Sequence, residues 1–569
     1  MSRQGVAACV VLLGLPVAGQ DVPPPEVDLS VLTRGPVWSV SFVGPDAVRQ
    51  AVLPTNLGGL FSAKENQFVG ALVSQAIGGM FQSGQAARAW RDLQQQLLGY
   101  SGRVDFEMHA DPDAGRDFYA PSGHLVLAPD GTTDLAVVGA QLRRLLLEAT
   151  GVEPQELEIA GRRFDALAGN AQDAITLPAI VGERLVLFYG EPIEKSVTRG
   201  LARLDEPGPD LSGGDLVAVA FDLAQFAAIY TADSIDSPAD LALGREFMGM
   251  DAWDRLRFSL RTAGPHLQVE GVVEFLPGNR GIFGAFMPSI TSLQGLASLV
   301  PLQPESQPAF LAAHVDGDAL YEAMIGFVAN FTLFGGGPKG REAAEAEVRE
   351  NLGFDFKEDL LAHLDSGVLV LQHLSLPAEG ERSVYHDGLC VVVRVEDEAA
   401  FTVAYEKIIA QTGSGAVVRI GSVEATPVRM FDRGEYLARS KGFAFFAVGK
   451  RGLAAAAEFV GRQSNPVDLD PSVLPVDLVR TQSQRPQGFN AAGVISTAFL
   501  RTSLGAELVR EMYLEVRREL GIDLSPDELQ EGTAAVVARL RQHGLDRVVV
   551  LGGYEAKGEA GTARVRLIW

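Results

Sequence analysis

The chain has 569 residues, of which 47% are hydrophobic. This apolar content excludes a disordered chain, and the length exceeds what one hydrophobic core organises. The formal net charge of −24 makes nucleic acid and anionic membrane surfaces unfavourable partners. No D-x-[DN]-x-[DN]-G loop accompanies the acidic residues, so we interpret them as a solubilising surface and not as a calcium site.

Residues 1–19 have the layout of a secretory signal peptide. Arg3 precedes an apolar run over residues 5–15, and Pro16 and small residues follow it. The alternative is an N-terminal membrane anchor, but the run is shorter than the roughly 20 residues that a spanning helix needs. We expect cleavage near Gly19 and a periplasmic or secreted protein that is not an integral membrane protein once the leader is removed.

Cleavage of the leader would remove Cys9 and leave Cys390 as the cysteine of the mature chain. Cys390 lies in the strand-like run LCVVVRV, which favours a small buried hydrophobe over a reactive thiol. No internal disulfide is therefore expected, and a protein of this size can build a sufficient core without one.

From residue 20 onward the expected order is a strand, a long helix, two strands, a helix, three strands, a helix, a strand, a helix and a hairpin. The glycine-containing segment FVGALVSQAIGGMF (68–81) could be read as a membrane or dimerisation helix. It is too short to span a bilayer and contains Ser74 and Gln75. We interpret it as a helix buried in the core.

The hairpin gives the clearest pattern of this first part. Leu256, Phe258 and Leu260 alternate with polar residues, and a turn at 263–265 precedes a second alternating run. This alternation predicts one buried and one solvated face. The segment 277–307 that follows is rich in glycine, proline and serine, so we place a domain boundary within it, near residue 295, and expect its apolar stretch IFGAFM to pack on the protein.

The rest of the chain repeats the first part in order. Glycines in similar local sequence recur with a period of about 265 residues, which is the size of a domain and not of a short repeat. The matched pairs are Gly102 and Gly367, Gly123 and Gly388, Gly161 and Gly421, and Gly190 and Gly449. We predict two tandem copies of an α+β domain, residues 20–294 and 295–569, each a mostly antiparallel sheet packed with helices.

The second copy ends in a predicted helix and hairpin. The helix has an S-x-x-E capping box at Ser525–Glu528 and a terminating Gly544. In the last strand, alternate apolar residues are expected to share a buried face, namely Ala563, Val565, Leu567 and Trp569.

Motifs that carry chemistry are missing from the sequence. It contains no G-x-S-x-G, H-E-x-x-H or C-x-x-C string. The stretch FGGGPKGRE (334–342) comes nearest a phosphate loop, but no Ser or Thr follows Lys339, and we interpret it as a joint between helices. No catalytic residue can be named, and no cofactor is expected.

The histidines show no i, i+4 pair and no short ligand spacing, so no metal site is expected. They are His109, His124, His266, His314, His363, His373, His386 and His543. The most suggestive group is His314, Asp316 and Asp318, since alternate strand residues share a face. Helix capping explains the aspartates better, because Asp318, like Asp46 and Asp222, precedes a helix-like segment.

A glycine–apolar–aspartate triplet recurs at 249–251, 353–355 and 521–523, which suits a helix end, a core contact and the start of the next element. The stretch LGFDFKEDLLAHLDSGVLVLQ (352–372), with the leader and the later strand GFAFFAVGKRGL (442–453), resembles the exported bacterial proteins grouped as domain-of-unknown-function family 3352. The resemblance is plainest over residues 300–569 and faint in the first copy. It implies a location in the cell envelope and supplies no activity or site residue.

These features favour an exported, non-catalytic protein that binds an envelope protein or an apolar ligand. The alternative is an envelope hydrolase whose carboxylates converge from distant positions. A self-associating structural component is a third reading, which long exposed apolar patches would favour. If the chain is a tandem duplication of one domain, we expect any binding site to lie between the two copies, lined by the first long helix of each copy and by IFGAFM.

Overall fold

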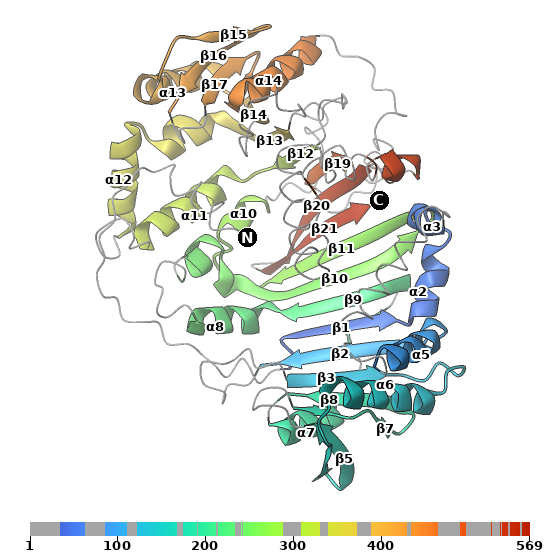
Figure 1. Ribbon diagram of the computed structural model, residues 1–569. Helices are drawn as coiled ribbons and strands as arrows, with labels where there is room; N and C mark the ends of the chain where they lie inside the picture. The colour runs from blue at the N-terminus through green and yellow to red at the C-terminus, as the bar shows by residue number, and fades with distance from the viewer. Residues whose placement is uncertain are drawn as a thin grey trace.

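We describe the protein from a computed structural model (Figure 1). The described residues are 35–62, 86–110, 122–167, 174–190, 192–206, 208–211, 214–233, 241, 243–287, 309–330, 340–372, 388–429, 434–464, 490–496, 525, 535, 538–543, 545, 547–557 and 560–568. Several predictions fall outside them. These are the signal peptide at 1–19, the helix at 68–81, the boundary near 295, the glycine-rich 334–339, most of the capping box at 525–528, Gly544 and Trp569.

The fold is α+β, with one large antiparallel sheet and helices on its faces. The strands in the first part of the chain are β1 (Trp38–Val43), β2 (Arg103–His109), β3 (Ser122–Leu127), β4 (Gln155–Ile159), β5 (Arg162–Leu167), β6 (Ile175–Thr176), β7 (Ala179–Val181), β8 (Arg184–Tyr189), β9 (Asp215–Asp222), β10 (Trp253–Ala263) and β11 (His266–Phe275). Those in the second part are β12 (Ala309–His314), β13 (Leu364–Gln372), β14 (Leu389–Val395), β15 (Val418–Ile420), β16 (Val423–Val428), β17 (Glu435–Ser440), β18 (Phe443–Val448), β19 (Ala491–Ser496), β20 (Arg547–Lys557) and β21 (Ala560–Ile568).

The hydrogen-bonded order of the strands is the same in both parts of the chain. The first part runs β4, β5, β6 with β7, β8, β3, β2, β1, β9, β10, β11. The second runs β15, β16, β17, β18, β14, β13, β12, β19, β20, β21. Strands β11 and β21 pair antiparallel and join the two series into one sheet, which Figure 1 shows running through the molecule.

The β11–β21 seam is reinforced by charged side chains. Arg566 on β21 donates a hydrogen bond of 2.8 Å to Glu270 on β11, and Arg261 on β10 donates one of 3.2 Å to the same carboxylate. The side chains of Arg566 and Glu270 are only 19% and 17% exposed. Partial burial strengthens such a charge-assisted contact relative to an exposed pair, so these side chains help to fix the register at the seam.

Helices cover both faces of the sheet. They are α2 (Pro45–Val52), α3 (Asn56–Ser62), α5 (Ala86–Leu98), α6 (Leu135–Thr150), α7 (Ile193–Arg203), α8 (Leu223–Asp233), α10 (Ile282–Ala285), α11 (Gly317–Asn330), α12 (Arg341–Leu352), α13 (Glu398–Thr412) and α14 (Gly449–Ser464). Short π or 3-10 turns are η6 (Leu243–Phe247), η7 (Met250–Ala252), η10 (Phe356–Leu360) and η11 (Leu361–His363). Among the described residues, no helix is both long and apolar enough to span a bilayer.

Separate cores form on the two faces of the sheet. Helices α5 and α6 pack on β2, β3 and β8 through a cluster that includes Leu93, Val138 and Leu185. Helix α7 packs on the other face of the same strands, where Val197 meets Phe188. The strand registers place α14 and its larger core, which includes Phe445 and Leu551, on the same face as α7. We call this the α7 face, and the opposite one the α6 face.

Local sequence explains how the helices begin and end. Asp134 caps α6 by accepting hydrogen bonds from the backbone N–H groups of its first turn, and Asp397 caps α13 in the same way. The predicted cap at Asp355 is confirmed, and Gly353 ends α12 in the left-handed conformation at φ 66°. Residues at the helix ends therefore specify where these helices begin and end.

Two of the predicted aspartate caps are wrong. Asp222 caps α8 by accepting from the N–H of Gln225, but Asp46 lies in the first turn of α2 and pairs with Arg49. In α11 the capping residue is Asp316, which accepts from the N–H of Ala319, while Asp318 lies two residues further on, in the first turn, and is exposed. A cap must precede the first helical residue, and these helices begin at 45 and 317, two residues earlier than the pattern suggested.

The predicted hairpin is confirmed, since β10 and β11 pair around a turn at 264–265. Its predicted buried face is not fully buried, because Phe258 is 39% exposed. The last strand shows a similar difference: Val565 is 48% exposed, whereas Ile568 joins the core of the α7 face. Alternation assigned the faces but not their burial, which depends on whether another element covers each face.

The apolar segment IFGAFM packs on the protein, as expected. It forms α10, and the carbonyl of Ala285 accepts a hydrogen bond of 2.7 Å from the N–H of Asp316, next to α11. Phe283 contacts Trp253 edge to face. The segment therefore contacts the start of the second series of strands and helices.

The seam predicts that the end of the chain is essential for stability. Deleting Val565–Trp569 should lower the free energy of unfolding by several kcal/mol, because it removes Ile568 from the core and strand pairing on both sides of β21. Thermal unfolding of the full and shortened chains measures the effect. Val565→Ser is the matched control and should change little, since that side chain is half exposed; an unchanged melting temperature in the shortened chain would contradict the assignment.

Candidate functional site

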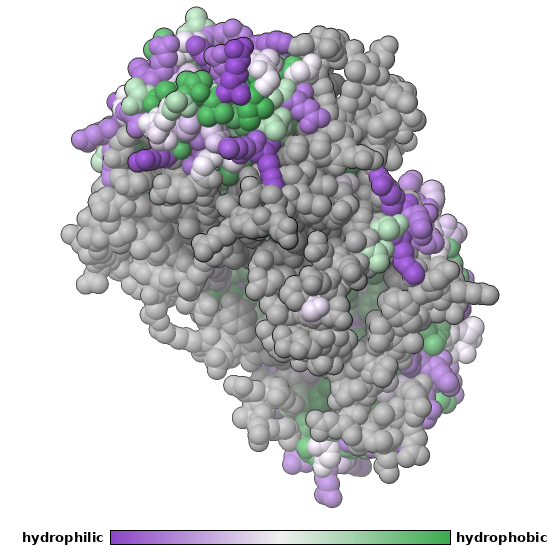
Figure 2. Space-filling view, turned by 45° about the horizontal axis from the view of Figure 1, so that its top comes forward, coloured by the Kyte–Doolittle hydropathy of each residue, from purple (hydrophilic) through white to green (hydrophobic). Residues whose placement is uncertain are grey.

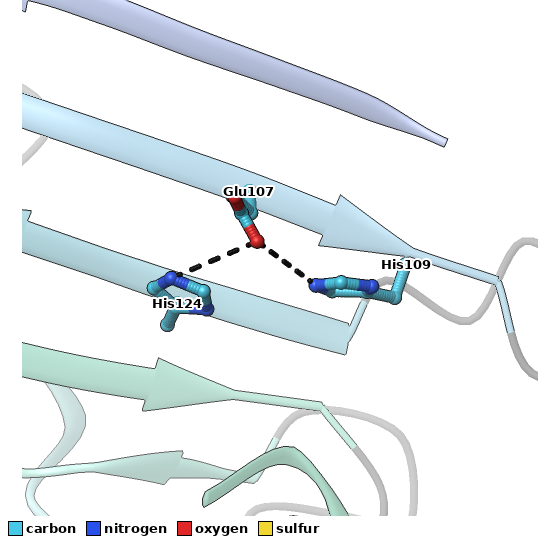
Figure 3. A group of neighbouring side chains, drawn as sticks. All are labelled: Glu107, His109 and His124. Carbon is cyan, nitrogen blue, oxygen red and sulfur yellow. Dashed lines mark ion pairs between the residues drawn. The ribbon is translucent and has the colours of Figure 1, made fainter. Parts of the chain in front are cut away.

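A buried group of ionisable side chains lies on the α7 face of β2 and β3. Glu107 and His109 alternate along β2, and His124 on β3 is the register partner of Glu107, so all three side chains point to the same face (Figure 3). Their side chains are only 3–5% exposed. One ligand atom from each residue lies within 4.8 Å of the others. We call Glu107, His109 and His124 the EHH cluster.

Glu107 is the centre of the EHH cluster. Its Oε2 lies 3.3 Å from Nε2 of His109 and 3.8 Å from Nε2 of His124. Arg203, the last residue of α7, donates two hydrogen bonds to the carboxylate, from Nε to Oε2 at 2.6 Å and from Nη2 to Oε1 at 3.0 Å. Arg203 also contacts Glu206 at 2.6 Å. The carboxylate thus ties α7 to the sheet.

The backbone at the EHH cluster requires a glycine. A Cβ at Gly123 on β3 would lie 1.9 Å from the carbonyl oxygen of Glu107. The same carbonyl accepts a hydrogen bond of 2.8 Å from the hydroxyl of Tyr189. Gly123 therefore allows β3 to approach β2 closely enough to set His124 beside Glu107.

The pKa values of the cluster are shifted in directions that its surroundings explain. Burial raises the pKa of Glu107, but the contacts of His109 and Arg203 outweigh burial and hold it at about 2. Burial lowers the pKa of His124 to about 4, and the nearby charge of Glu107 opposes this only in part. At neutral pH the cluster therefore holds a carboxylate and a neutral His124, and their 3.8 Å contact is not a full ion pair.

Two imidazole nitrogens of the cluster are incompletely satisfied. Nδ1 of His124 is buried and makes no hydrogen bond, and the buried Nε2 of His109 has the 3.3 Å contact with the Glu107 carboxylate but no well-formed hydrogen bond. Buried polar atoms are paired in the large majority of cases, because an unpaired one has lost its water without replacement. The cluster is therefore not fully satisfied by the protein alone.

A polar hollow of about 570 Å³ adjoins the cluster on the α7 face. Glu107 and Arg203 form part of its wall, and further charged residues come from β9, β10 and β11, namely Asp215, Asp222, Arg255, Arg257 and Glu270. Burial raises the pKa of Asp215, and the charge of Arg261 counteracts this. Carboxylates from three strands thus meet in one hollow, in different electrostatic surroundings.

An apolar surface lies on the opposite, α6 face, across the seam. Phe258 and Val565 stand in one cross-strand row with Gly271 between them, and Leu311 and Ile495 belong to neighbouring rows of the same face. These four large side chains are 39–48% exposed. We call Phe258, Val565, Leu311 and Ile495 the seam patch.

The sequence-predicted group of His314, Asp316 and Asp318 does not form a site. His314 is buried and its Nδ1 lies 2.9 Å from the hydroxyl of Ser366, Asp316 caps α11, and Asp318 pairs with Lys357. Cys390 is buried as expected, and burial raises the pKa of its thiol to about 12. Sequence reasoning missed the EHH cluster. The string E-x-H at 107–109 on an expected strand was the available signal.

The chain matches no protein-family model and no curated protein. Among solved structures it shows a distant likeness to TP0453. Crystal form I of that protein matches at 12% identity with a TM-score of 0.22, over 45% of this chain and 80% of TP0453. Crystal form IV matches at 10% identity with a TM-score of 0.21. A likeness at this level carries no argument about function, and the resemblance to family 3352 stays a prediction.

The EHH cluster yields a stability prediction. Glu107→Gln should lower the free energy of unfolding by about 2–4 kcal/mol, because it removes one member of a largely buried ion pair and leaves Arg203 beside a neutral amide. Glu156→Gln is the matched control: its pair with Arg163 is mostly exposed, and its loss should cost less than about 0.5 kcal/mol. Urea unfolding measures both.

The pH dependence of the free energy of unfolding of Glu107→Gln and Glu156→Gln tests the same contact independently. The pKa of Glu107 is about 2 in the folded protein against an ordinary value of 4.5. Its ionised form therefore contributes stability in full above pH 4.5, and this contribution is lost as the pH falls toward 2. The loss of unfolding free energy in Glu107→Gln, relative to the unsubstituted protein, should therefore become smaller as the pH falls from 4.5 toward 2. A deficit independent of pH, or one no larger than that of Glu156→Gln, would contradict the role of the charge.

Proposed function

We propose that this chain is an exported, non-catalytic binding protein of the bacterial cell envelope, periplasmic or secreted, that takes an apolar ligand at the seam patch. The observation that carries this proposal is the set of four large apolar side chains, 39–48% exposed, on one face at the junction of the two strand series. Exposed apolar side chains gathered in one place mark binding sites more often than scattered ones do. The leader-like residues 1–19 and the resemblance to exported proteins support the location.

We further propose that the chain is a tandem duplication, with copies at 20–294 and 295–569. The identical strand order of the two series supports this, as do the equivalent caps at Asp134 and Asp397. Gly190 and Gly449 both follow the last strand of a hairpin with positive φ, and both donate a backbone hydrogen bond to the start of that hairpin. Under this proposal the seam patch lies between the copies, but strand residues form it, and not the first long helices and the IFGAFM segment that the sequence led us to expect as the lining.

The surroundings of the seam patch favour a small apolar ligand over a protein partner. Strands β10, β11, β20, β21 and β19 each have neighbours on both sides, so no free strand edge is offered there for strand addition. Four half-exposed side chains fall short of the roughly 800 Å² per partner that a stable protein interface buries. An apolar ligand is therefore the proposed occupant, and an envelope protein is the competing one.

Substitution of the seam patch tests the proposal. The double change Phe258→Ser and Val565→Ser should weaken binding of the apolar fluorescent probe N-phenylnaphthylamine by about tenfold or more, since each large apolar contact contributes on the order of 1 kcal/mol or more. The measurement is a fluorescence titration. Both side chains are well exposed, so the fold should tolerate the change.

Val403→Ser is the matched control, since Val403 is 56% exposed on α13. Figure 2 shows that the described surface over α13, α14 and β15–β17 also mixes hydrophobic with hydrophilic residues. Equal probe binding by the double variant and the parent would refute the proposal. Capture of one envelope protein from its native membrane fraction, lost in the double variant, would replace the ligand by that protein.

The alternative function is that of an envelope hydrolase acting in the polar hollow. It is favoured by carboxylates that converge from distant positions, since Glu107, Asp215 and Glu270 come from β2, β9 and β11. The pKa of Glu107 is held low and that of Asp215 is raised, as a base and an acid in one site require. Turnover of an ester, glycoside or peptide substrate that Asp215→Asn abolishes would select this function over ligand binding.

A further inference from the structure

We propose that the EHH cluster is a binding site for a divalent transition-metal ion of the zinc class, held by the carboxylate of Glu107 and the imidazoles of His109 and His124. This site lies on the α7 face, opposite the seam patch, and is independent of ligand binding there. The sequence alone predicts no metal site, because the histidines lack ligand spacing and because helix capping explains the aspartates near His314. Neither reason applies to the EHH cluster, whose ligands come from two neighbouring strands.

The ligand atoms are spaced as a small ion requires. Tetrahedral zinc with bonds of about 2.0–2.1 Å holds its ligand atoms about 3.4 Å apart. The distances from Oε2 of Glu107 to Nε2 of His109 and of His124 are 3.3 and 3.8 Å, close to that spacing, and all three ligand atoms lie within 4.8 Å of one another, so a shift of the side chains toward a common centre completes the geometry. The strands fix all three residues, since they are flanked by ladder pairing on both sides.

The donor set selects the class of metal. Two imidazoles and one carboxylate are a common set for zinc and also suit iron(II), whereas calcium and magnesium prefer all-oxygen sites. Nε2 of His109 is nine-tenths buried or more and faces the carboxylate at 3.3 Å, and the buried Nδ1 of His124 makes no hydrogen bond, so an ion between the three groups would replace contacts that are incomplete. A purely structural ion pair between Glu107 and Arg203 needs neither histidine.

Arg203 competes with the metal for Glu107. Its Nε donates to Oε2, the same oxygen that faces both histidines. Arg203 also contacts Glu206 at 2.6 Å, which is 56% exposed, so a second carboxylate can hold the guanidinium when an ion takes Oε2. Because Glu107 lines the polar hollow, an ion has a route to the cluster from that side.

The experiment uses the full chain, stripped with a chelator and titrated with Zn²⁺ by calorimetry, with Co²⁺ absorption as a readout of geometry. We expect one tight ion per chain. His109→Gln and His124→Gln should each weaken binding by at least about 100-fold, as the loss of a ligand does. Arg203→Gln should tighten binding by about tenfold, because the competing cation is gone. A merely structural role for Arg203 predicts no such gain.

Two controls keep the result clear. His266→Gln, on β11 away from the cluster, should leave binding unchanged and reports adventitious zinc at surface histidines. If a cluster variant fails to fold, ¹⁵N-histidine spectra of the unsubstituted chain decide, since zinc should shift two of its eight histidines. No stoichiometric binding by either the parent or Arg203→Gln, or binding that the His109 and His124 variants leave unchanged, would overturn the site.

Discussion

The pairing of β11 with β21 is the constraint on which the rest of the structure depends. It joins a strand from the middle of the chain to its final strand, and so turns two series of strands into one sheet. The α7 face carries charge at the seam, through Glu270, Arg261 and Arg566, while the α6 face carries the seam patch. The seam patch follows from this pairing, whereas the EHH cluster lies within the first series of strands.

The EHH cluster shows how position on the sheet creates chemistry. Glu107 holds α7 through Arg203 and at the same time faces two histidines, so one carboxylate serves packing and electrostatics together. Burial strengthens the electrostatic contacts within the EHH cluster. In water such contacts would be worth little, but in a site that is nearly closed to solvent the same charges fix the protonation state of their neighbours.

Several elements of the fold could be predicted from the sequence, because the residues that specify them are close together in the chain. The β10–β11 hairpin and the caps at Asp222 and Asp355 each depend on a few neighbouring residues. The EHH cluster was not legible, because His124 meets Glu107 only through the register of β2 with β3. Nor could the exposure of Phe258 and Val565 be predicted, since alternation shows which residues share a face and not what covers it.

The seam also sets the order in which the molecule can be completed. Of the described strands, β21 comes last in the chain, so β11 has a partner only on its β10 side until synthesis has passed residue 568. An unpaired strand edge is a template for association with other chains. During synthesis the first series of strands is therefore exposed to mispairing until β21 has been made, and a chain that stops before β21 leaves the β11 edge unpaired.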